Sequence, residues 1–173
     1  MTTPWFTSRK MDARNQDPDQ IHSAQRLIEN HMKNGVALAQ EDSEIQACRK
    51  VMLELRPHVG PDEFLARVRR QQEIAGYQLA YAFDGDVKAV AGFRISECLA
   101  WGKFLYVDDL VTAGGDRSRG YGGALFDWLI VYAKEAGCDE FHLDSGVHRF
   151  AAHRFYLTKR MSIEAHHFGM KLW

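Results

Sequence analysis

A glycine-rich segment between a strand pattern and a helix pattern places the strongest constraint on this chain. Five glycines fall within residues 114–123, after the strand-like run 101–112 and where a helical pattern begins that reaches about residue 136. The apolar face of that helix consists of Leu125, Trp128, Leu129, Tyr132 and Ala136. The N-terminus of a helix leaves backbone N–H groups unpaired and carries a partial positive charge. Because glycines let a ligand approach the backbone closely, this order of elements predicts a phosphate site at the start of the helix.

The rest of the chain predicts an α/β fold around a mixed sheet. Residues 1–16 read as a loose arm, and Asp17-Pro18 begins a helix that Gly35 can close, so we expect residues 1–35 to be an extension of a domain over 36–173. A capping box of Ser43 with Gln46 starts the next helix, and Pro61 opens another. The remaining predicted elements are strands at 36–39, 77–83, 87–95, 101–112 and 140–144, a helix at 148–159 and a final strand at 162–173.

Composition and charge indicate which partners and which compartment to expect for this chain. Lys and Arg total 22 and Asp and Glu total 23, which gives a net charge of −1 and does not indicate nucleic acid or an anionic membrane as the main partner. The three cysteines are far apart and form no Cys-x-x-Cys pair, which is typical of reduced thiols. We find no signal-peptide pattern and no apolar run of membrane-spanning length, so we expect a cytoplasmic protein.

The glycine segment does not match the two best-known phosphate motifs. A P-loop requires Lys after its glycines, and none follows here. The dinucleotide pattern Gly-x-Gly-x-x-Gly fails because Leu125 stands where its third glycine would be. Arg117 and Arg119 add cationic donors suited to phosphate oxygens. Taken alone, the segment leaves a flexible surface loop as an open alternative.

Several motifs together resemble the GNAT acetyltransferases. Arg117-x-x-Gly120-x-Gly122 is similar to the Arg/Gln-x-x-Gly-x-Gly/Ala motif of that family, and it follows the strand end Asp108-Asp109-Leu110-Val111-Thr112 as it does there. Phe155-Tyr156 resembles the Phe-Tyr pair of the family's C-terminal helix. The likeness covers residues 36–173 and implies a mixed, mostly antiparallel central sheet flanked by helices, with strands 4 and 5 splayed apart.

The resemblance implies acetyl-CoA as co-substrate and gives roles to particular residues. The pyrophosphate would be held by Arg117, Ser118, Arg119, Gly120, Tyr121, Gly122 and, nearby, Gly123. The pantetheine arm would pair like an added strand with Leu110, Val111 and Thr112. Tyr156 would protonate the departing thiolate, although a Tyr beside Phe can also be core with its hydroxyl satisfied. Arg149 stands where the family often has Asn, and Arg160 where it commonly has Gly, which puts the geometry of the last helix in question.

An amine must lose a proton to attack a thioester, so a base or a water relay is expected. By likeness to polyamine acetyltransferases, which carry a Glu-Asp pair near this strand end, Asp108 is the first candidate, acting directly or through water, and Asp109 is the second. The alternative is that Asp108 is a hydrogen-bonded carboxylate at a strand end. Strand alternation sends the two side chains to opposite faces of the sheet.

Three further residues are candidates for contacting the acceptor. His142 and Asp144 alternate on one face of the predicted strand 140–144, and His148 stands at the start of the helix that follows. Convergence of Asp144 with Asp108 and Asp109 would make an acidic mouth that suits a cationic amine. The histidines show no ligand spacing, and the adjacent His166 and His167 point apart on a strand, so we expect no metal.

The sequence therefore predicts an N-acetyltransferase that moves an acetyl group from acetyl-CoA to a primary amine by direct attack in a ternary complex. A non-catalytic acyl-CoA-binding or sensor module on the same fold is the first alternative, and an interaction protein with a merely flexible glycine loop is the second. The amine could be a small molecule or a group on a protein. A homodimer paired through the C-terminal strand is also open.

Overall fold

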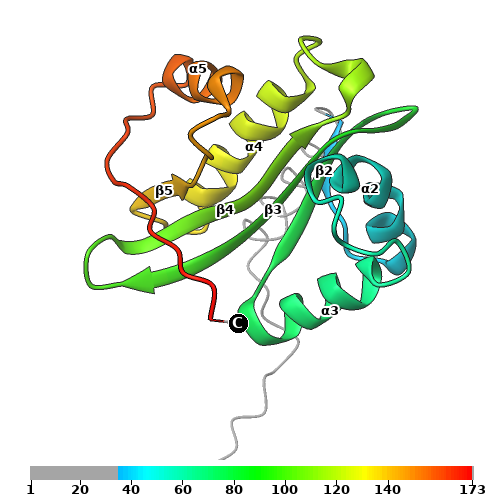
Figure 1. Ribbon diagram of the computed structural model, residues 1–173, viewed down its shortest axis with the longest axis horizontal. Helices are drawn as coiled ribbons and strands as arrows, with labels where there is room; N and C mark the ends of the chain where they lie inside the picture. The colour runs from blue at the N-terminus through cyan, green and yellow to red at the C-terminus, as the bar shows by residue number, and fades with distance from the viewer. Residues whose placement is uncertain (1–34, 173) are drawn as a thin grey trace, which may run out of the picture. The chain divides into compact units, whose positions relative to one another are not determined.

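The computed structural model describes residues 35–172, which contain one five-stranded sheet in the order β1-β2-β3-β4-β5 (Figure 1). Neighbouring strands are antiparallel except for β4 and β5, which are parallel. The mixed, mostly antiparallel sheet flanked by helices is thus confirmed. The elements are β1 (Val36–Leu38), α2 (Asp42–Leu55), α3 (Phe64–Ala75), β2 (Gln78–Asp84), β3 (Asp86–Cys98), β4 (Gly102–Thr112), a 3-10 turn η1 (Gly114–Asp116), α4 (Tyr121–Glu135), β5 (Glu140–Leu143) and α5 (Phe150–Thr158). The arm and helix expected over residues 1–35 lie, apart from Gly35, outside the described residues.

Local sequence signals place most of the element ends. Gly76 ends α3 in the left-handed conformation at φ 61°, and Gly85 makes the tight turn between β2 and β3 at φ 74°. The predicted cap of α2 is wrong by two residues. Glu41 is the N-cap and Glu44 completes the capping box, because the Glu44 carboxylate accepts hydrogen bonds from the backbone N–H of Glu41 and of Gln40.

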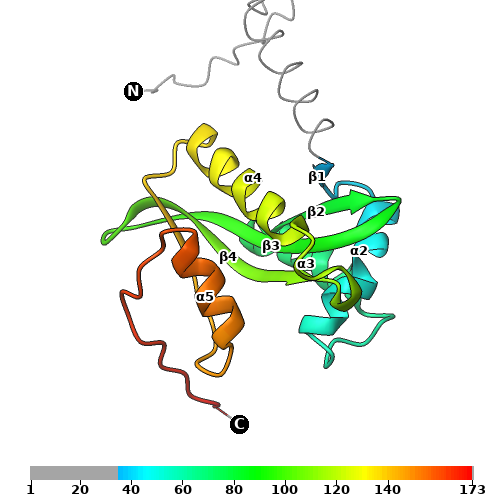
Figure 2. The same ribbon diagram turned by 90° about the horizontal axis from the view of Figure 1, so that it is seen from above.

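The helices form a layer on each face of the sheet (Figure 2). Helix α4 packs on one face, in a cluster whose largest buried members are Phe93, Leu105, Leu125, Trp128 and Leu129. Helices α2 and α3 pack on the other face around Ile45, Cys48, Phe64, Val68 and Leu79. The central strands β2, β3 and β4 are therefore covered on both faces, whereas β5 at the edge has no buried residue.

A β-bulge in β4 changes which residues face each layer. Gly92 of β3 pairs with Asp109, whereas the next residue, Phe93, pairs with Val107, so Asp108 is the extra residue. Before the bulge, Leu105 and Val107 pack towards α4; after it, Val111 packs towards α2 and α3. Simple alternation along β4 would have put all three residues on one face.

The C-terminal segment is not the strand that its sequence pattern predicts. Residues 161–172 carry no regular secondary structure, and Ile163, Phe168, Met170 and Leu172 are exposed. An alternating pattern makes a strand only where an edge accepts its hydrogen bonds, and within the described part of the chain these residues pair with no strand. Instead the segment runs back in front of β5 and β4 (Figure 1). Pairing through it in a homodimer stays a prediction.

No helix within residues 35–172 has the length and apolar character needed to cross a membrane.

Candidate functional site

The loop between β4 and α4 ends in a helix N-terminus with open backbone donors. After η1, Ser118 and Gly120 adopt positive φ angles of 63° and 95°, and α4 begins at Tyr121. The first helical bond at this end runs from the Ala124 N–H to the Gly120 carbonyl at 2.9 Å. The preceding helical N–H groups, at Tyr121, Gly122 and Gly123, have no earlier turn to bond to and are available to an anion.

Gly122 lets α4 start directly against β4. A Cβ at this position would lie 2.5 Å from the Thr112 Oγ1, closer than real contacts of this kind. A Cβ at Gly120 would meet nothing within 4 Å, but the φ of 95° there is one that L residues rarely adopt. The two glycines of the motif therefore have different tasks: Gly120 makes the turn and Gly122 makes the close contact between helix and strand.

The two arginines of the loop differ in how firmly they are held. Arg119 Nη1 donates to Asp116 Oδ1 at 2.7 Å, and its guanidinium lies 5.7 Å from the Tyr121 ring centre. Arg117 is 67% exposed, and its nearest ion-pair partner is Glu54 at 3.8 Å. Arg117 is thus free to turn towards a bound phosphate, whereas Arg119 mainly stiffens the loop.

Lys159 is a candidate at this helix N-terminus that the sequence did not reveal. Its Nζ lies 3.9 Å from where a Cβ would stand on Gly123, and it contacts both carboxylate oxygens of Asp127 at 2.6 and 2.7 Å. The residue follows α5 directly, far from the loop in sequence, so no local motif could have pointed to it.

Strand β4 continues past the end of its pairing with β5. The last parallel pair is Val107 with Leu143, yet β4 extends to Thr112. Along residues 108–112, β4 pairs with β3 on one side and with no described strand on the other. Backbone groups on this second edge can accept an extended ligand as an added strand. The splay of strands 4 and 5 is therefore present, and it leads straight into the glycine loop.

Asp108 and Asp109 face the same cavity, so the expectation that they point to opposite faces is wrong. The bulge at Asp108 removes the alternation between them. Both line a cavity of about 290 Å³ between the sheet and helices α2 and α3. The other lining residues are Met52, Arg56, His58, Val59, Phe64, Arg67, Val68, Gln71, Tyr77 and Arg94.

Each of the two aspartates is paired with an arginine that sequence reasoning missed. Arg94 Nε and Nη2 bind the two carboxylate oxygens of Asp108 at 2.9 and 2.7 Å. Arg56 Nε donates to Asp109 Oδ1 at 2.6 Å, and its Nη2 donates to the Asp108 backbone oxygen at 3.0 Å. The hydrogen bonds to Asp108 raise the pKa of Arg94 further above its ordinary value. The paired residues are far apart in the sequence, so no local pattern predicts the two ion pairs.

Tyr77 closes the floor of this cavity. Its hydroxyl donates to Asp109 Oδ2 at 3.2 Å, and burial raises its pKa well above the ordinary value, with the neighbouring Asp109 adding to the effect. A Cβ on Gly92 would lie 1.8 Å from the same hydroxyl oxygen. Gly92 is thus required by the space that the Tyr77 ring occupies.

Tyr156 lies on α5 against the aromatic side chains that join α5 to α4. Its ring centre is 6.3 Å from that of Phe126 and 5.5 Å from that of Phe155. The side chain is half-buried, and this burial raises the pKa of its hydroxyl, an effect that the charge of Arg149 partly offsets. Within residues 35–172 the Tyr156 hydroxyl has no hydrogen-bond partner. A Tyr that only filled the core would more usually have a bonded hydroxyl.

The three expected acceptor residues lie in β5 and in the segment between β5 and α5. Asp144 Oδ2 accepts a hydrogen bond from the Tyr106 hydroxyl at 2.6 Å, and His167 Nδ1 lies 2.9 Å from the same oxygen. His148 is exposed in the turn before α5, which begins at Phe150 rather than at His148. Asp144 and His148 do not line the cavity that contains Asp108 and Asp109.

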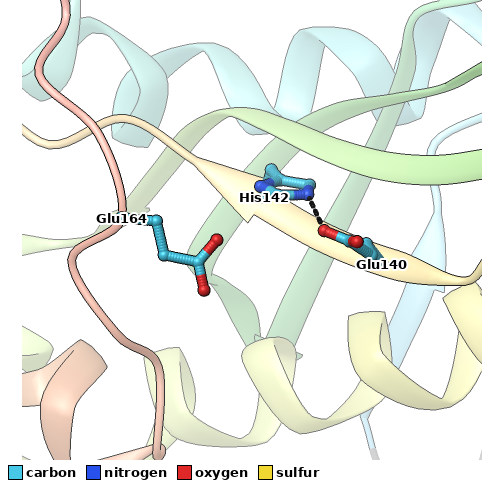
Figure 3. A group of neighbouring side chains, drawn as sticks. All are labelled: Glu140, His142 and Glu164. Carbon is cyan, nitrogen blue, oxygen red and sulfur yellow. Dashed lines mark hydrogen bonds and ion pairs between the residues drawn. The ribbon is translucent and has the colours of Figure 1, made fainter. Parts of the chain in front are cut away.

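His142 has a ring contact and a polar contact. Its ring stacks on Trp101, in the turn before β4, with 4.0 Å between ring centres. Its Nε2 lies 2.7 Å from Glu140 Oε2 (Figure 3). Glu164 completes a group whose donor atoms lie within 4.8 Å of one another. The carboxylates of Glu140 and Glu164 are both exposed. Exposed acidic groups commonly lie close together without binding an ion, so we assign no metal to this group.

The comparisons with known proteins agree with one another. The family model described as the acetyltransferase (GNAT) family matches residues 37–161. The chain belongs to the GNAT acetyltransferase family. An N-acetyltransferase of Bacillus subtilis, the uncharacterised YhdJ, is 33% identical over 110 residues, which is 63% of this chain and 78% of the relative.

Solved structures share the GNAT fold. A protein of Agrobacterium tumefaciens described as an acetyltransferase superposes with a TM-score of 0.69 at 22% identity, over 79% of this chain and 98% of its own. An aminoglycoside N-acetyltransferase solved with CoA gives a TM-score of 0.68 at 15% identity, over 80% of this chain and 95% of its own. These structural similarities support the fold. Membership of the family supports an acyltransferase activity.

One departure from the GNAT pattern has a clear backbone consequence. Arg160 stands where the family commonly has Gly, and it adopts a left-handed φ of 66°. The Met161 N–H donates to the Tyr156 carbonyl at 3.1 Å and the Arg160 N–H to the Leu157 carbonyl at 3.0 Å, which completes a Schellman cap. The helix end thus keeps the geometry that glycine favours, with an arginine in its place.

Replacing Arg160 with Gly is expected to stabilise the protein by about 1 kcal/mol. The left-handed conformation costs an L residue roughly 1–2 kcal/mol, of which the greater chain entropy of Gly offsets roughly 0.5–1 kcal/mol. Urea denaturation would measure the change. The matched control is Arg154→Gly, at an exposed position within α5, which should lose about 1 kcal/mol instead. A loss of stability in Arg160→Gly would contradict this account of the cap.

Proposed function

We propose that this GNAT protein transfers the acetyl group of acetyl-CoA directly to a primary amine within a ternary complex. The observation that carries the proposal is the continuity of the unpaired β4 edge with the glycine loop. Residues 108–112 lack a described partner on the β5 side, and the strand leads through residues 113–120 to the open N-terminus of α4. An extended pantetheine arm ending in a pyrophosphate matches an edge that ends in backbone N–H donors.

The residues of the loop divide the work of holding the cofactor. The backbone N–H groups of Tyr121, Gly122 and Gly123 would meet the pyrophosphate, and Arg117 would close over it from its exposed position. The backbone of Leu110, Val111 and Thr112 would pair with the pantetheine arm. Ser118, Arg119 and Gly120 set the course of the loop, since two of them hold positive φ angles and the third is bound to Asp116. Lys159 adds a positive charge beside Gly123.

The reaction would form a C–N bond and break the thioester C–S bond. The amine nitrogen attacks the acetyl carbon, one of its protons passes to a base, and the thiolate leaves with a proton from an acid. Tyr156 is the proposed acid, because its hydroxyl has no bonded partner among residues 35–172 and burial keeps it protonated. Asp108 is the proposed base, acting through a water that bonds to its remaining lone pairs, because Arg94 uses one lone pair on each of its carboxylate oxygens.

Replacing Asp108 with Asn is expected to flatten the rise of activity with pH, because the amide cannot take up the proton of the amine. The size of the loss at the optimum would be on the order of 10²-fold, which is the low end for general-base assistance. The rate profile from pH 6 to 10 tests this, with Asp109→Asn as the matched control in the same cavity. A rise with pH like that of the unaltered protein would remove Asp108 as the base.

A non-catalytic acyl-CoA-binding or sensor module is the alternative function. Both functions predict that CoA raises the melting temperature, because a ligand that binds only the folded state stabilises it. A free-thiol release assay with acetyl-CoA and a panel of amines separates them, since only an enzyme releases thiol in an amine-dependent way. Absence of a thermal shift with CoA would count against both functions and favour a loop without a ligand.

A further inference from the structure

The cavity that holds Asp108 and Asp109 is not the acidic mouth that the sequence suggested. All four carboxylate oxygens already have donors: two are bound by Arg94, one by Arg56 and one by the Tyr77 hydroxyl. Arg94 and Arg56 also balance the two negative charges, so the two aspartates leave no excess negative charge to attract an ammonium group. A cationic acceptor is therefore a poor match for this cavity.

The guanidinium groups, in contrast, have donors to spare. A guanidinium carries five N–H donors. The bonds of Arg56 and Arg94 run through Nε and Nη2, and neither side chain has a partner at Nη1 among residues 35–172. Arg67, from α3, likewise meets Glu63 through Nε and Nη2. Three guanidinium groups around one cavity thus keep an unused nitrogen each.

The aspartate side chains are more buried than the arginine side chains, so an entering molecule contacts the positive charges first. The side chains of Asp109 and Asp108 are 13% and 20% exposed, whereas those of Arg56 and Arg94 are 43% and 36% exposed. The carboxylates therefore lie in the floor and the guanidinium groups lie nearer the opening. Arg67 is also 43% exposed and, with His58, lines the same cavity. The planar fork of a guanidinium matches a carboxylate well.

We propose that the acceptor is a small amino acid-like molecule whose carboxylate binds Arg67, Arg56 and Arg94 in this cavity. The volume of about 290 Å³ is at the small end for ligand cavities, which favours a compact acceptor. This inference rests on the proposed function, and it deepens that function by giving the substrate class. It predicts that the carboxylate is recognised independently of the amine that reacts.

The test compares free L-amino acids with their α-carboxamides as acceptors in the thiol release assay, which changes the carboxylate and keeps the side chain. O-phosphoethanolamine and spermidine complete the panel. We expect kcat/KM for the best amino acids to exceed that for their carboxamides by at least about ten-fold, as expected for a lost charge-assisted hydrogen bond. Equal rates for acids and carboxamides, or preference for spermidine or O-phosphoethanolamine, would overturn the proposal.

Arg67→Gln tests the cavity itself and leaves the pairs of Asp108 and Asp109 intact, because within residues 35–172 the Arg67 side chain pairs with Glu63, the N-cap of α3. We expect KM for the preferred amino acid to rise about ten-fold and KM for its carboxamide to stay within about two-fold. Arg70→Gln is the matched control, on the same helix, exposed and outside the cavity. A rise of KM for acid and carboxamide alike would show a merely structural role and contradict the inference.

A binding measurement keeps the inference separate from catalysis. With CoA present, N-acetyl-L-amino acids should raise the melting temperature, and Arg67→Gln should reduce that shift while Arg70→Gln leaves it. If these shifts appear but no amine releases thiol, the proposed catalysis fails and the carboxylate cavity stands. If thiol is released but N-acetyl-amino acids give no shift and carboxamides are preferred, the proposed function stands and this inference fails.

Discussion

Replacing Gly122 with Val is expected to lower the affinity for acetyl-CoA at least about 100-fold, equivalent to about 2.7 kcal/mol. The first side-chain atom would stand 2.5 Å from the Thr112 Oγ1, so the start of α4 must move away from β4. Overpacking of this kind costs typically 1–3 kcal/mol. Because the pyrophosphate is proposed to bind the N–H groups of that same turn, the displacement reaches the ligand. Isothermal titration with acetyl-CoA and with CoA would measure the loss.

Two controls separate the helix–strand contact from an effect on the ligand. Gly115→Ala adds a methyl group in the same loop where nothing lies within 4 Å, and should leave the affinity unchanged. Gly122→Ala is then compared with and without Thr112→Ala, which removes the atom that the new methyl would strike. Recovery of affinity in the double variant assigns Gly122 to packing alone. Normal stability with weak binding assigns it also to close approach of the pyrophosphate. Unchanged affinity in Gly122→Val would contradict the assignment of this loop to pyrophosphate binding.

Replacing Tyr156 with Phe is expected to lower turnover by about 10²-fold or more, within the usual range for loss of a general acid. Burial raises the pKa of Tyr156 above its ordinary value of 10.0, so the phenol remains protonated where an amine acceptor becomes neutral. The affinity for acetyl-CoA should change less than about two-fold, because the change removes one oxygen and keeps the ring contacts with Phe126 and Phe155.

The stability of Tyr156→Phe sharpens the test. Since the Tyr156 hydroxyl has no partner within residues 35–172, its loss should leave the melting temperature unchanged. The control is Tyr132→Phe, whose hydroxyl donates to Gln78 at 2.7 Å and whose removal should cost about 1 kcal/mol of stability with little effect on turnover. A Tyr156→Phe protein that matches the unaltered rate at every pH would show that Tyr156 is not the acid.

Arg56, Arg94 and Arg67 change the chemistry that the sequence suggested for the acceptor. From sequence, three aspartates in this region favoured a cationic amine. In the structure Asp108 and Asp109 are neutralised by Arg94 and Arg56, and Asp144 is bonded to Tyr106 and His167 away from the cavity. At the opening of the cavity, guanidinium N–H donors without a partner among residues 35–172 outnumber free acceptors. The prediction from single aspartates was wrong because the arginines that neutralise them come from other strands and helices.

Local sequence patterns predict the order of the elements from β1 to α5, the turns and the donor loop. These features depend on neighbours within a few residues. Gly76 and Gly85 adopt positive φ angles because they lack a Cβ, and helix α4 begins after Gly120 because glycine permits the φ of 95° at its N-cap. The GNAT resemblance rested on the same local patterns, and the family comparison confirmed it.

Three features follow from long-range contacts instead: the direction of the Asp108 side chain, the arginines that bind it, and the absence of a strand at residues 161–172. The bulge arises from the register of β4 against β3, and a one-residue change of register moves a side chain to the other face. A strand at the C-terminus needs an edge that accepts it. Both outcomes depend on contacts between segments far apart in the chain, and local patterns of residues carry no information about such contacts.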